Sequence, residues 1–502
     1  MPNSLTKKAV LTAVSNLLGQ SVQIFVGFVV TPIVIRGLGA ELYGALQMIE
    51  QAVQYLARSD LRPAGTLRVF LSVRQNSNDY HEKQRLIGAS LLLCLFMWPL
   101  LLTVGLFLAW SAPSFIKVSS EHALAVQITM GIAVLRVGLD KLLGLPGSIL
   151  GGVNLEYKAM GLGAATLLIS GVLSAIAITV GWGLVGVGVA AATGVLLNGG
   201  IRFFVARKNI PWLGVARPSG AELASFTKSS SWFFVSSIAD ALLNISDLLI
   251  VGIVLGPAPA GIYATTGAVL RMVVAPFSRI LSSTSAGIGD LCGQKDWSRV
   301  VLIRQEMHII AMVVMTIISA GVIGLNRSFL GIWVGSGFYS GDLVNIIMVF
   351  IAYARVLLRA DVVLLDNLLI FKERSIAFLG CGIFTFLTGY LLTYMVGAVG
   401  MALSVLFGQI GLFWFCNKFI QKRIENFDIK LMPFKPRLVI IMIAILVISY
   451  IININFQFNN FISFFFVAIF FTCINTIMLW LFGLDASNRS HFMCRFKTLL
   501  AR

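Results

Sequence analysis

The sequence predicts an all-α, polytopic membrane protein with 14 transmembrane helices, and composition is the first reason. Of its 502 residues, 58% are hydrophobic and 12% are charged, whereas a soluble domain carries about 25% charged residues. The mean hydropathy is +0.91. The second reason is the length of the apolar segments, and the third is the distribution of Lys and Arg between them.

Apolar segments long enough to cross a bilayer recur along the chain, since a spanning helix needs roughly 20 residues. The first follows Lys7 and Lys8 but ends at Arg36 without a small-residue cleavage site, so we expect a retained helix and not a signal peptide. Fourteen segments meet the requirement: 9–35, 42–62, 86–110, 122–149, 158–181, 183–205, 229–255, 260–286, 301–325, 342–371, 375–396, 397–417, 437–455 and 461–484.

The net charge of +17 fits the excess of Lys and Arg that membrane proteins carry in their cytoplasmic loops. With both termini inside, most of the 38 Lys and Arg, Arg304 among them, fall in inner segments. The outer loops then hold Arg36, Lys117 and Arg327. We therefore predict cytoplasmic termini, and the charge gives no reason to expect nucleic acid as a partner.

Cysteines and histidines indicate neither a metal site nor a cofactor. The six Cys contain no CxxC pair and lie mostly in or beside apolar segments, as small apolar side chains do. The four His are scattered without ligand spacing. No nucleophile and base recur at a spacing that would indicate an enzyme.

The chain repeats itself once. Leu38-Gly39 follows the first predicted helix and Leu255-Gly256 follows the seventh, and LRVGL in 122–149 matches ARVLL in 342–371. Two copies of a six-helix unit would share one orientation, related by a pseudo-twofold axis along the membrane normal. The predicted division is an N-terminal lobe (1–208), a cytoplasmic linker (209–228), a C-terminal lobe (229–420), a basic cytoplasmic linker (421–436), two additional helices (437–484) and a cytoplasmic tail (485–502).

Cations inside the predicted helices are the candidate substrate-binding residues. A charge at the bilayer centre costs roughly 2.5–3.5 kcal/mol, so it is expected to face a bundle interior or a hydrated cavity. Arg355, Arg359 and Asp366 fall within about 40° of one another on one helix face, whereas Asp361 points elsewhere. The six candidate cations are Arg58, Arg136, Arg271, Arg279, Arg355 and Arg359. Arg58, near a helix end, could instead extend to the interface.

Polar side chains form stripes on several of the same helices, at i, i+4 and i+7 spacing, as expected for helices that line water. The candidate cavity-lining or coupling residues are Asp240, Asn244, Asp247, Glu50, Gln47, Gln51, Gln54, Asp140 and Asp366. Two alternatives stay open. The stripes could form hydrogen bonds between helices, and the carboxylates could either pair with the arginines (Asp140 with Arg136, for example) or titrate. Because central arginines outnumber carboxylates, we predict an anionic substrate.

The opening SNLLGQSVQIFVGFVVTPIVIRGLGAELYGALQ combines an apolar helix, Thr-Pro, an Arg-Gly-Leu-Gly turn and Tyr-Gly. This combination resembles the polysaccharide-unit flippases (Wzx-type O-antigen transporters) of the multidrug/oligosaccharidyl-lipid/polysaccharide exporter superfamily. The segment SVRQNSNDYHEKQRLIGASLLL is similar to the second loop of that family. The resemblance extends over the whole chain in hydropathy, helix number and duplication.

The resemblance implies two six-helix lobes in a V, around a central cavity that opens alternately to cytoplasm and periplasm. The cargo would be an undecaprenyl-diphosphate-linked oligosaccharide, such as an O-antigen unit for lipopolysaccharide, moved across the bacterial inner membrane. Its isoprenoid would stay in lipid. The segments 437–455 and 461–484 would either form a groove for it or serve only as two further lipid-facing helices, and the sequence favours the second alternative. Expected partners are this lipid-linked substrate, a polysaccharide polymerase and a chain-length regulator, and the protein is expected to work as a monomer.

The fold class and helix number are also compatible with two rival functions. A polytopic polysaccharide polymerase or ligase would have a long periplasmic loop, and the outer loops predicted at 111–121 and 326–341 are short. A multidrug cation extruder of the same fold would favour acidic and aromatic walls, and the central arginines argue against it.

Overall fold

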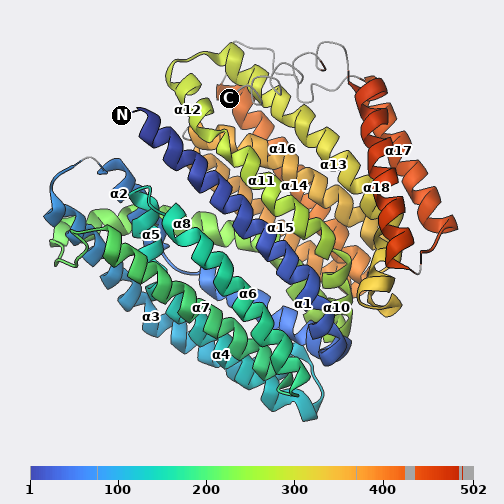
Figure 1. Ribbon diagram of the computed structural model, residues 1–502, viewed down its shortest axis with the longest axis horizontal. Coiled ribbons are helices and arrows are strands. Elements are labelled where there is room, and N and C mark those ends of the chain that lie inside the picture. The colour runs from blue at the N-terminus through green and yellow to red at the C-terminus, as the bar shows by residue number, and fades with distance from the viewer. Residues whose placement is uncertain are drawn as a thin grey trace. The chain divides into compact units, whose positions relative to one another are not determined.

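The computed structural model describes residues 2–75, 77–368, 370–423, 436–458, 460–484 and 489. Most of the predicted basic linker 421–436 and of the predicted tail 485–502 lies outside the described residues. The described chain is overwhelmingly helical and contains no strand, which confirms the all-α class (Figure 1).

The chain divides into two compact units, residues 1–261 with 378–386, and residues 262–377 with 387–502. Unit 1 contains α1 (Pro2–Arg58), α2 (Pro63–Val73), α3 (Tyr80–Ile116), the 3₁₀ turn η1 (Ser120–His122), α4 (Ala123–Leu143), α5 (Leu145–Gly152), α6 (Tyr157–Thr179), α7 (Gly183–Asn209), α8 (Gly220–Asn244), α9 (Ser246–Leu255) and the start of α10 (Pro257–Thr266). Unit 2 continues with α11 (Ala268–Ser283), α12 (Ser285–Gly293), α13 (Trp297–Trp333), the 3₁₀ turn η2 (Ser336–Phe338), α14 (Asp342–Asn367), most of α15 (Phe371–Val396), α16 (Ala398–Arg423), α17 (Pro436–Asn455), α18 (Phe461–Met478) and the π-helical turn η3 (Leu479–Gly483).

These units differ from the predicted lobes in two places, because unit 1 extends to residue 261 and also includes residues 378–386 of α15. Helices α8 and α9, predicted as the start of the second lobe, pack in unit 1 against α1. The division into lobes at 209–228 therefore stays a prediction.

The described residues contain ten helices long and apolar enough to cross a membrane, or twelve if each of two bent pairs counts as one span. Two features account for the difference from 14. The stretch Leu18–Arg58 is 41 residues long, about twice what one crossing needs, and joins the first two predicted helices across a break at Gly39. Helix α14 carries five charged residues, which lower its hydropathy. The multi-pass membrane class is confirmed, and the count of 14 stays a prediction.

The duplication predicted from the sequence has counterparts in local backbone structure. Gly39 has φ 73° and ψ 176°, and Gly256 has φ 98° and ψ 171°. Both conformations are open to glycine and strained for other residues. A 3₁₀ turn also precedes the fourth predicted helix of each copy, η1 before α4 and η2 before α14. In both copies the third helix packs on the fourth and the fourth on the sixth.

Large apolar side chains remain exposed on the outer faces of the helices, as they do where lipid is the solvent. Phe96 and Phe107 on α3 are 74% and 62% exposed, and Phe466 on α18 is 68% exposed. Soluble monomers rarely expose apolar patches of such extent. Within unit 1, α6 and α7 run side by side, and α7 also packs against α4 (Figure 1).

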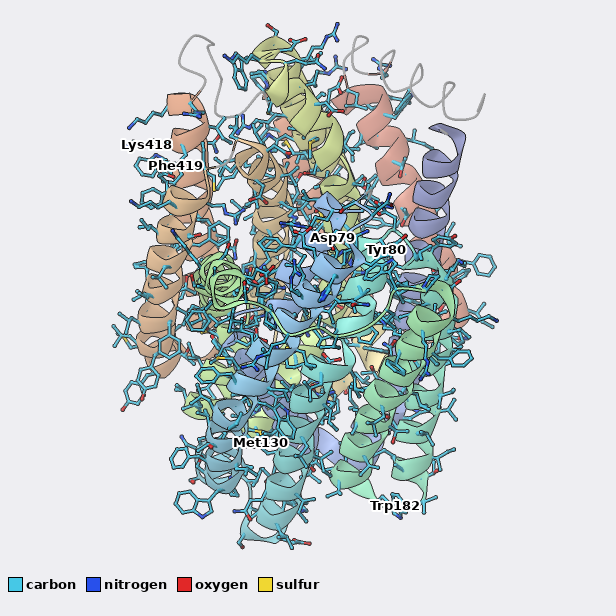
Figure 2. The ribbon with its side chains drawn as sticks, turned by 90° about the vertical axis from the view of Figure 1, so that its left-hand side faces the viewer. Asp79, Tyr80, Met130, Trp182, Lys418 and Phe419 are labelled. Carbon is cyan, nitrogen blue, oxygen red and sulfur yellow. The ribbon has the colours of Figure 1, made fainter. Side chains whose placement is uncertain are left out.

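The loops predicted to lie on the inner side gather at one end of unit 1. Figure 2 shows Asp79 and Tyr80 well away from Trp182, which precedes α7. The Tyr80 and Trp212 rings stack with centroids 6.2 Å apart, and Gln84 Nε2 donates to the Trp212 carbonyl at 2.9 Å. The segments before α3 and before α8 thus lie together. This is expected for two loops that are both predicted to lie on the same side of the membrane.

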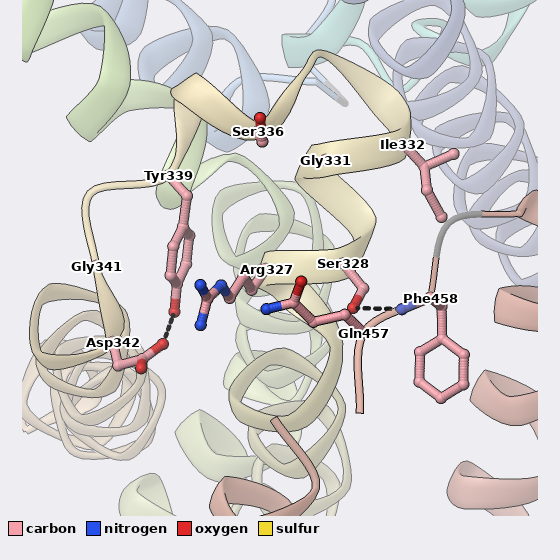
Figure 3. A pocket seen from close by; sticks show the side chains of 10 residues that line it. All are labelled: Arg327, Ser328, Gly331, Ile332, Ser336, Tyr339, Gly341, Asp342, Gln457 and Phe458. Carbon is pink, nitrogen blue, oxygen red and sulfur yellow. Dashed lines mark hydrogen bonds between the residues drawn. The ribbon is translucent and has the colours of Figure 1, made fainter. Parts of the chain in front are cut away.

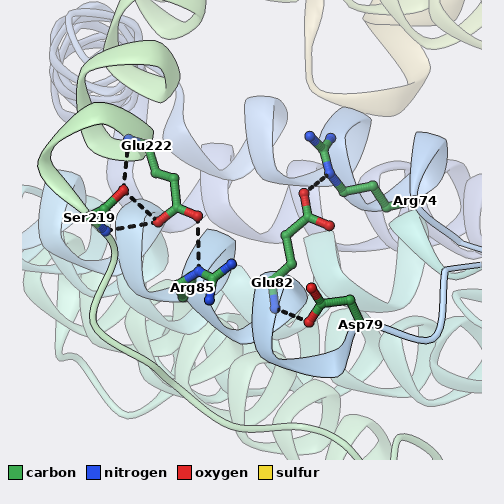
Figure 4. Close-up of polar contacts among 6 residues, drawn as sticks. All are labelled: Arg74, Asp79, Glu82, Arg85, Ser219 and Glu222. Atoms are coloured by element: carbon green, nitrogen blue, oxygen red, sulfur yellow. Dashed lines mark hydrogen bonds and ion pairs between the residues drawn. The ribbon is translucent and has the colours of Figure 1, made fainter.

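Ion pairs and helix caps fix this end of the unit (Figure 4). Ser219 and Glu222 form a capping box at the start of α8, and Arg85 Nε donates to Glu222 Oε1 at 2.9 Å. Asp79 caps α3 by accepting from the Glu82 N–H. Hydrogen bonds from the Ser219 backbone and side chain, with a smaller contribution from Arg85, hold the pKa of Glu222 below its ordinary value of 4.5.

Glu222→Gln is expected to lower the thermal stability of the detergent-solubilised protein near neutral pH, with the difference from wild type disappearing in acid. The folded-state pKa is lowered, so the carboxylate stabilises the fold above pH 4.5 and loses this contribution as the pH falls through the folded-state value. Melting temperatures of both proteins across pH check this. Glu121→Gln, at an exposed position in η1, is the control, and a pH-independent deficit for Glu222→Gln would contradict the assignment.

Candidate substrate site

The candidate cation of α4 is paired across helices. Arg136 Nη2 donates to Glu50 Oε2 on α1 at 2.6 Å, with the two side chains 18% and 31% exposed. Asp140, predicted as a possible partner one turn along α4, is exposed. The structure thus favours the interhelical pair over the intrahelical one.

A second charge pair joins α4 to the segment just after α1. Lys141 Nζ lies 2.7 Å from Asp60 Oδ2 and also donates to the Ala57 carbonyl. Asp60 is 6% exposed, so its charge is neutralised where water has little access. Such pairing is what a buried carboxylate requires.

The candidate residues of α8 meet the end of α1. Arg58 forms an ion pair with Asp240, and Asn244 Nδ2 donates to the other carboxylate oxygen at 2.8 Å. Tyr55 also donates to the Ala241 carbonyl at 3.1 Å. The polar stripes of α1 and α8 are therefore in direct contact.

The remaining candidates of unit 1 differ in their surroundings. Asp247, half-buried at the start of α9, accepts from the Leu248 N–H at 2.9 Å. On α1, Gln47 and Gln51 are half-buried and Gln54 is exposed. Gln51 Oε1 is buried without a hydrogen-bond partner among the described residues.

Arg355 and Arg359 of α14 have different contacts from those of Arg136. Arg359 Nε donates to Ser282 Oγ on α11 at 2.9 Å. Arg355 is half-buried, and its Nε and Nη2 are buried with no hydrogen-bond partner in the described part of the chain. An orphaned guanidinium costs free energy, so Arg355 is a place where a ligand could supply the missing acceptor.

The other candidates of unit 2 lie on α11 and at the end of α14. Arg271 is exposed and donates to the Ala264 carbonyl, and Arg279 is exposed. Asp366 pairs with Arg374 on α15, so it neutralises neither Arg355 nor Arg359 through an ion pair. The common helix face expected for Arg355, Arg359 and Asp366 thus does not become a single ion-paired group.

Charge compensation is the clearest contrast between these two sets of candidates. In unit 1, Arg58 and Arg136 each have a carboxylate partner. In unit 2, none of the four candidate arginines forms an ion pair with any described residue. The candidate arginines without an ion pair to a described residue are therefore those of α11 and α14.

A buried charge network was missed by the sequence-based reasoning. Arg304 on α13 is 2% exposed and donates from Nε to Asp361 Oδ1 at 2.7 Å, and it also donates to Asn417 on α16. His308 Nε2 lies 3.2 Å from the same Asp361 oxygen. Arg304 had been grouped with loop cations. The sequence did contain one indication of this network. Asp361 lies on a different helix face from Arg355 and Arg359, and a carboxylate inside a membrane helix needs a partner, which here had to come from another helix.

No group of three or more metal-ligating side chains is placed to hold an ion in the part of the chain that was described. The polar groups of the site are thus arginines, carboxylates and amides.

Comparison with known proteins identifies the family. Residues 10–285, more than half of the chain, match the family model described as "Polysaccharide biosynthesis protein". The chain belongs to this family. No curated protein sequence matches the chain significantly.

Solved structures show the same fold at low sequence identity. The lipid II flippase MurJ in an inward closed conformation is 12% identical with a TM-score of 0.65, covering 95% of this chain and 99% of its own. An inward-facing multidrug resistance MATE family transporter of the MOP superfamily is 14% identical with a TM-score of 0.64, covering 81% and 96%. This member of the polysaccharide biosynthesis family therefore shares its fold with a lipid II flippase and a multidrug resistance transporter.

Proposed function

We propose that the protein is a flippase for an undecaprenyl-diphosphate-linked oligosaccharide, such as an O-antigen unit, in the bacterial inner membrane. Family membership supports a role in polysaccharide biosynthesis, and the fold shared with a lipid II flippase supports movement of a lipid-linked substrate. The proposal includes cytoplasmic termini and alternating access. A polysaccharide polymerase and a chain-length regulator would act on the product.

The observation that carries the proposal is the uncompensated Arg355. Its Nε and Nη2 are buried without acceptors among the described residues, and Arg359 one turn along α14 contacts a neutral hydroxyl. A diphosphate offers the oxygen acceptors that an arginine fork binds in pairs. In this proposal α14 binds the diphosphate, while the isoprenoid remains in lipid.

A multidrug cation extruder is the alternative, because one similar structure is a multidrug resistance transporter. The four arginines of α11 and α14 repel an organic cation, and no described carboxylate forms an ion pair with them. The charge therefore favours an anionic cargo over a cationic one.

Location of the lipid-linked oligosaccharide in a strain lacking the gene tests the function. A periplasmic probe that cannot cross the membrane should find single units missing from the outer leaflet, with units accumulating on the cytoplasmic side. Units that reach the periplasm but stay unpolymerised would instead indicate an assembly enzyme. An unchanged glycan with new sensitivity to toxic cations would indicate an extruder.

Arg355→Ala is expected to reduce flipping about tenfold or more, because hydrogen bonds to charged groups contribute roughly 1.5–3 kcal/mol. The same change removes an unsatisfied buried cation, so the melting temperature should stay constant or rise. Arg355→Lys should retain part of the activity, since it keeps the charge but loses the fork. Flipping in reconstituted vesicles and melting temperature are the two measurements.

Arg299→Ala provides the matched control, because this side chain is 72% exposed near the start of α13. It should leave both measurements unchanged. Full activity of a stable Arg136→Ala, Arg355→Ala double variant would refute diphosphate binding by these arginines.

A further inference from the structure

A cavity of about 620 Å³ lies in unit 2, at the opposite end of α13 from its start at Trp297. Three segments build it: the end of α13, the connection through η2 to α14, and the residues that follow α17. Figure 3 shows the Arg327 guanidinium between the Tyr339 ring and the Gln457 side chain. The volume falls within the roughly 300–1,000 Å³ typical of small-molecule sites.

Hydrogen bonds join the three segments around the cavity. Tyr339 donates from its hydroxyl to Asp342 Oδ1 at 2.7 Å, and Asn453 Nδ2 donates to the same oxygen at 2.9 Å. The Phe458 N–H donates to Ser328 Oγ at 3.2 Å. The cavity wall is therefore held in place before any ligand enters.

The tyrosine of this wall stays neutral. Burial, together with the adjacent Asp342 carboxylate, raises the pKa of Tyr339. Its hydroxyl thus remains a donor to Asp342 at any physiological pH, so the Asp342 charge is partly satisfied within the wall.

Arg327 is the uncompensated charge of the cavity. It forms no ion pair with a described residue. The cavity also contains Asp342, whose Oδ1 accepts hydrogen bonds from Tyr339 and Asn453. Ser336 and Gln457 also line the cavity, and the Gln457 side chain lies beside the guanidinium in Figure 3. The cavity thus offers one arginine without an ion pair, together with the Asp342 carboxylate and neutral polar groups. This set suits a ligand whose anionic group contacts the arginine and whose hydroxyls donate to and accept from the other groups.

We propose that this cavity is a second binding site of the protein, specific for a sugar acid whose carboxylate contacts Arg327 and whose hydroxyls contact the surrounding polar groups. A lipid headgroup with a glycerophosphate has related chemistry. The sugar acid fits better because the cavity is far larger than one phosphate requires and its polar lining can bind a whole pyranose ring. The assignment of this sugar acid to the transported glycan rests on the proposed function. The proposal that the cavity binds a sugar acid does not depend on that function.

The test is a titration of the full-length protein in phosphatidylcholine nanodiscs with D-glucuronate, followed by saturation-transfer NMR. We expect saturable binding of glucuronate and at least about tenfold weaker binding of D-glucose, because the glucose lacks the charge. Arg327→Gln should weaken glucuronate binding by about the same factor and leave glucose unchanged. Equal affinity for the two sugars, or no effect of Arg327→Gln, would overturn the proposal.

A glycine pair supplies a steric test that leaves charge untouched. A Cβ on Gly331, which lines the cavity, meets no atom within 4 Å, so Gly331→Trp should fill the cavity and abolish binding. Gly321 is equally open but does not line the cavity, and Gly321→Trp should bind normally. Binding that survives Gly331→Trp would refute the site.

Two outcomes separate this site from its alternatives. Loss of glucuronate binding in nanodiscs made with phosphatidylglycerol would assign the cavity to a lipid headgroup and overturn the sugar acid. A protein that fails the flipping assay yet binds glucuronate through Arg327 would refute the proposed function while supporting the cavity.

Discussion

Replacing Asp361 with alanine is expected to leave little folded protein in the membrane. Asp361 is fully buried and is the ion-pair partner of Arg304, which is 2% exposed. Removing one partner of a buried pair typically costs about 3–5 kcal/mol, because the other charge remains without compensation. That is a large fraction of the roughly 5–15 kcal/mol by which proteins are stable.

The measurement is the yield of monodisperse protein and its melting temperature in detergent. Asp366→Ala on the same helix is the control, because its side chain is 38% exposed and its loss should have a small effect. The double variant Arg304→Met, Asp361→Leu should recover much of the loss, since apolar residues can replace a buried pair. A double variant as unstable as Asp361→Ala would show that stranded charge is not the cause.

Gly44→Val is expected to disrupt unit 1 with a comparable effect. The Cβ of any larger residue at position 44 would overlap the carbonyl oxygen of Pro257. The contact is reciprocal, since a Cβ on Gly261 would lie 2.9 Å from the Ala40 carbonyl oxygen and 3.1 Å from Gly44 Cα. Backbone meets backbone here, as at helix crossings built from small residues.

Overpacking of this kind costs about 1–3 kcal/mol and more where backbone cannot move. Thermal unfolding of Gly44→Ala and Gly44→Val should show a graded loss. Gly19→Val, in the same helix with no atom within 4 Å of the added Cβ, should be close to wild type. Equal stability of Gly44→Val and Gly19→Val would contradict the close backbone contact between α1 and α10 at Gly44.

The length and apolar character of the segments were sufficient to predict the helices, because a bilayer requires both of every spanning helix. The turn at Leu38-Gly39 was likewise recognisable, since its counterpart at Leu255-Gly256 repeats the same residues. The described residues contain ten to twelve candidate spans and not fourteen, because α1 runs through the turn at Gly39 and α14 is charged.

Partners across helices could not be read from the sequence. The stripe on α1 indicated that Glu50 faces polar surroundings, but its pairing with Arg136 depends on how α4 packs against α1. Asp361 shows the same limit, because its partners Arg304 and Asn417 come from α13 and α16. Helical geometry relates residues within one helix, whereas charge compensation is a property of packed neighbours.

The matching bends at Gly39 and Gly256 also bear on the ancestry of the molecule. A backbone conformation that favours glycine, at the same point of both copies, is most simply inherited from a single ancestral unit. The arginines of the corresponding fourth helices differ in their contacts, since Arg136 has a carboxylate partner and Arg355 has none among the described residues. Under the proposed function, Arg355 of the second copy is the arginine left free to bind a negatively charged group, whereas Arg136 of the first copy is already paired.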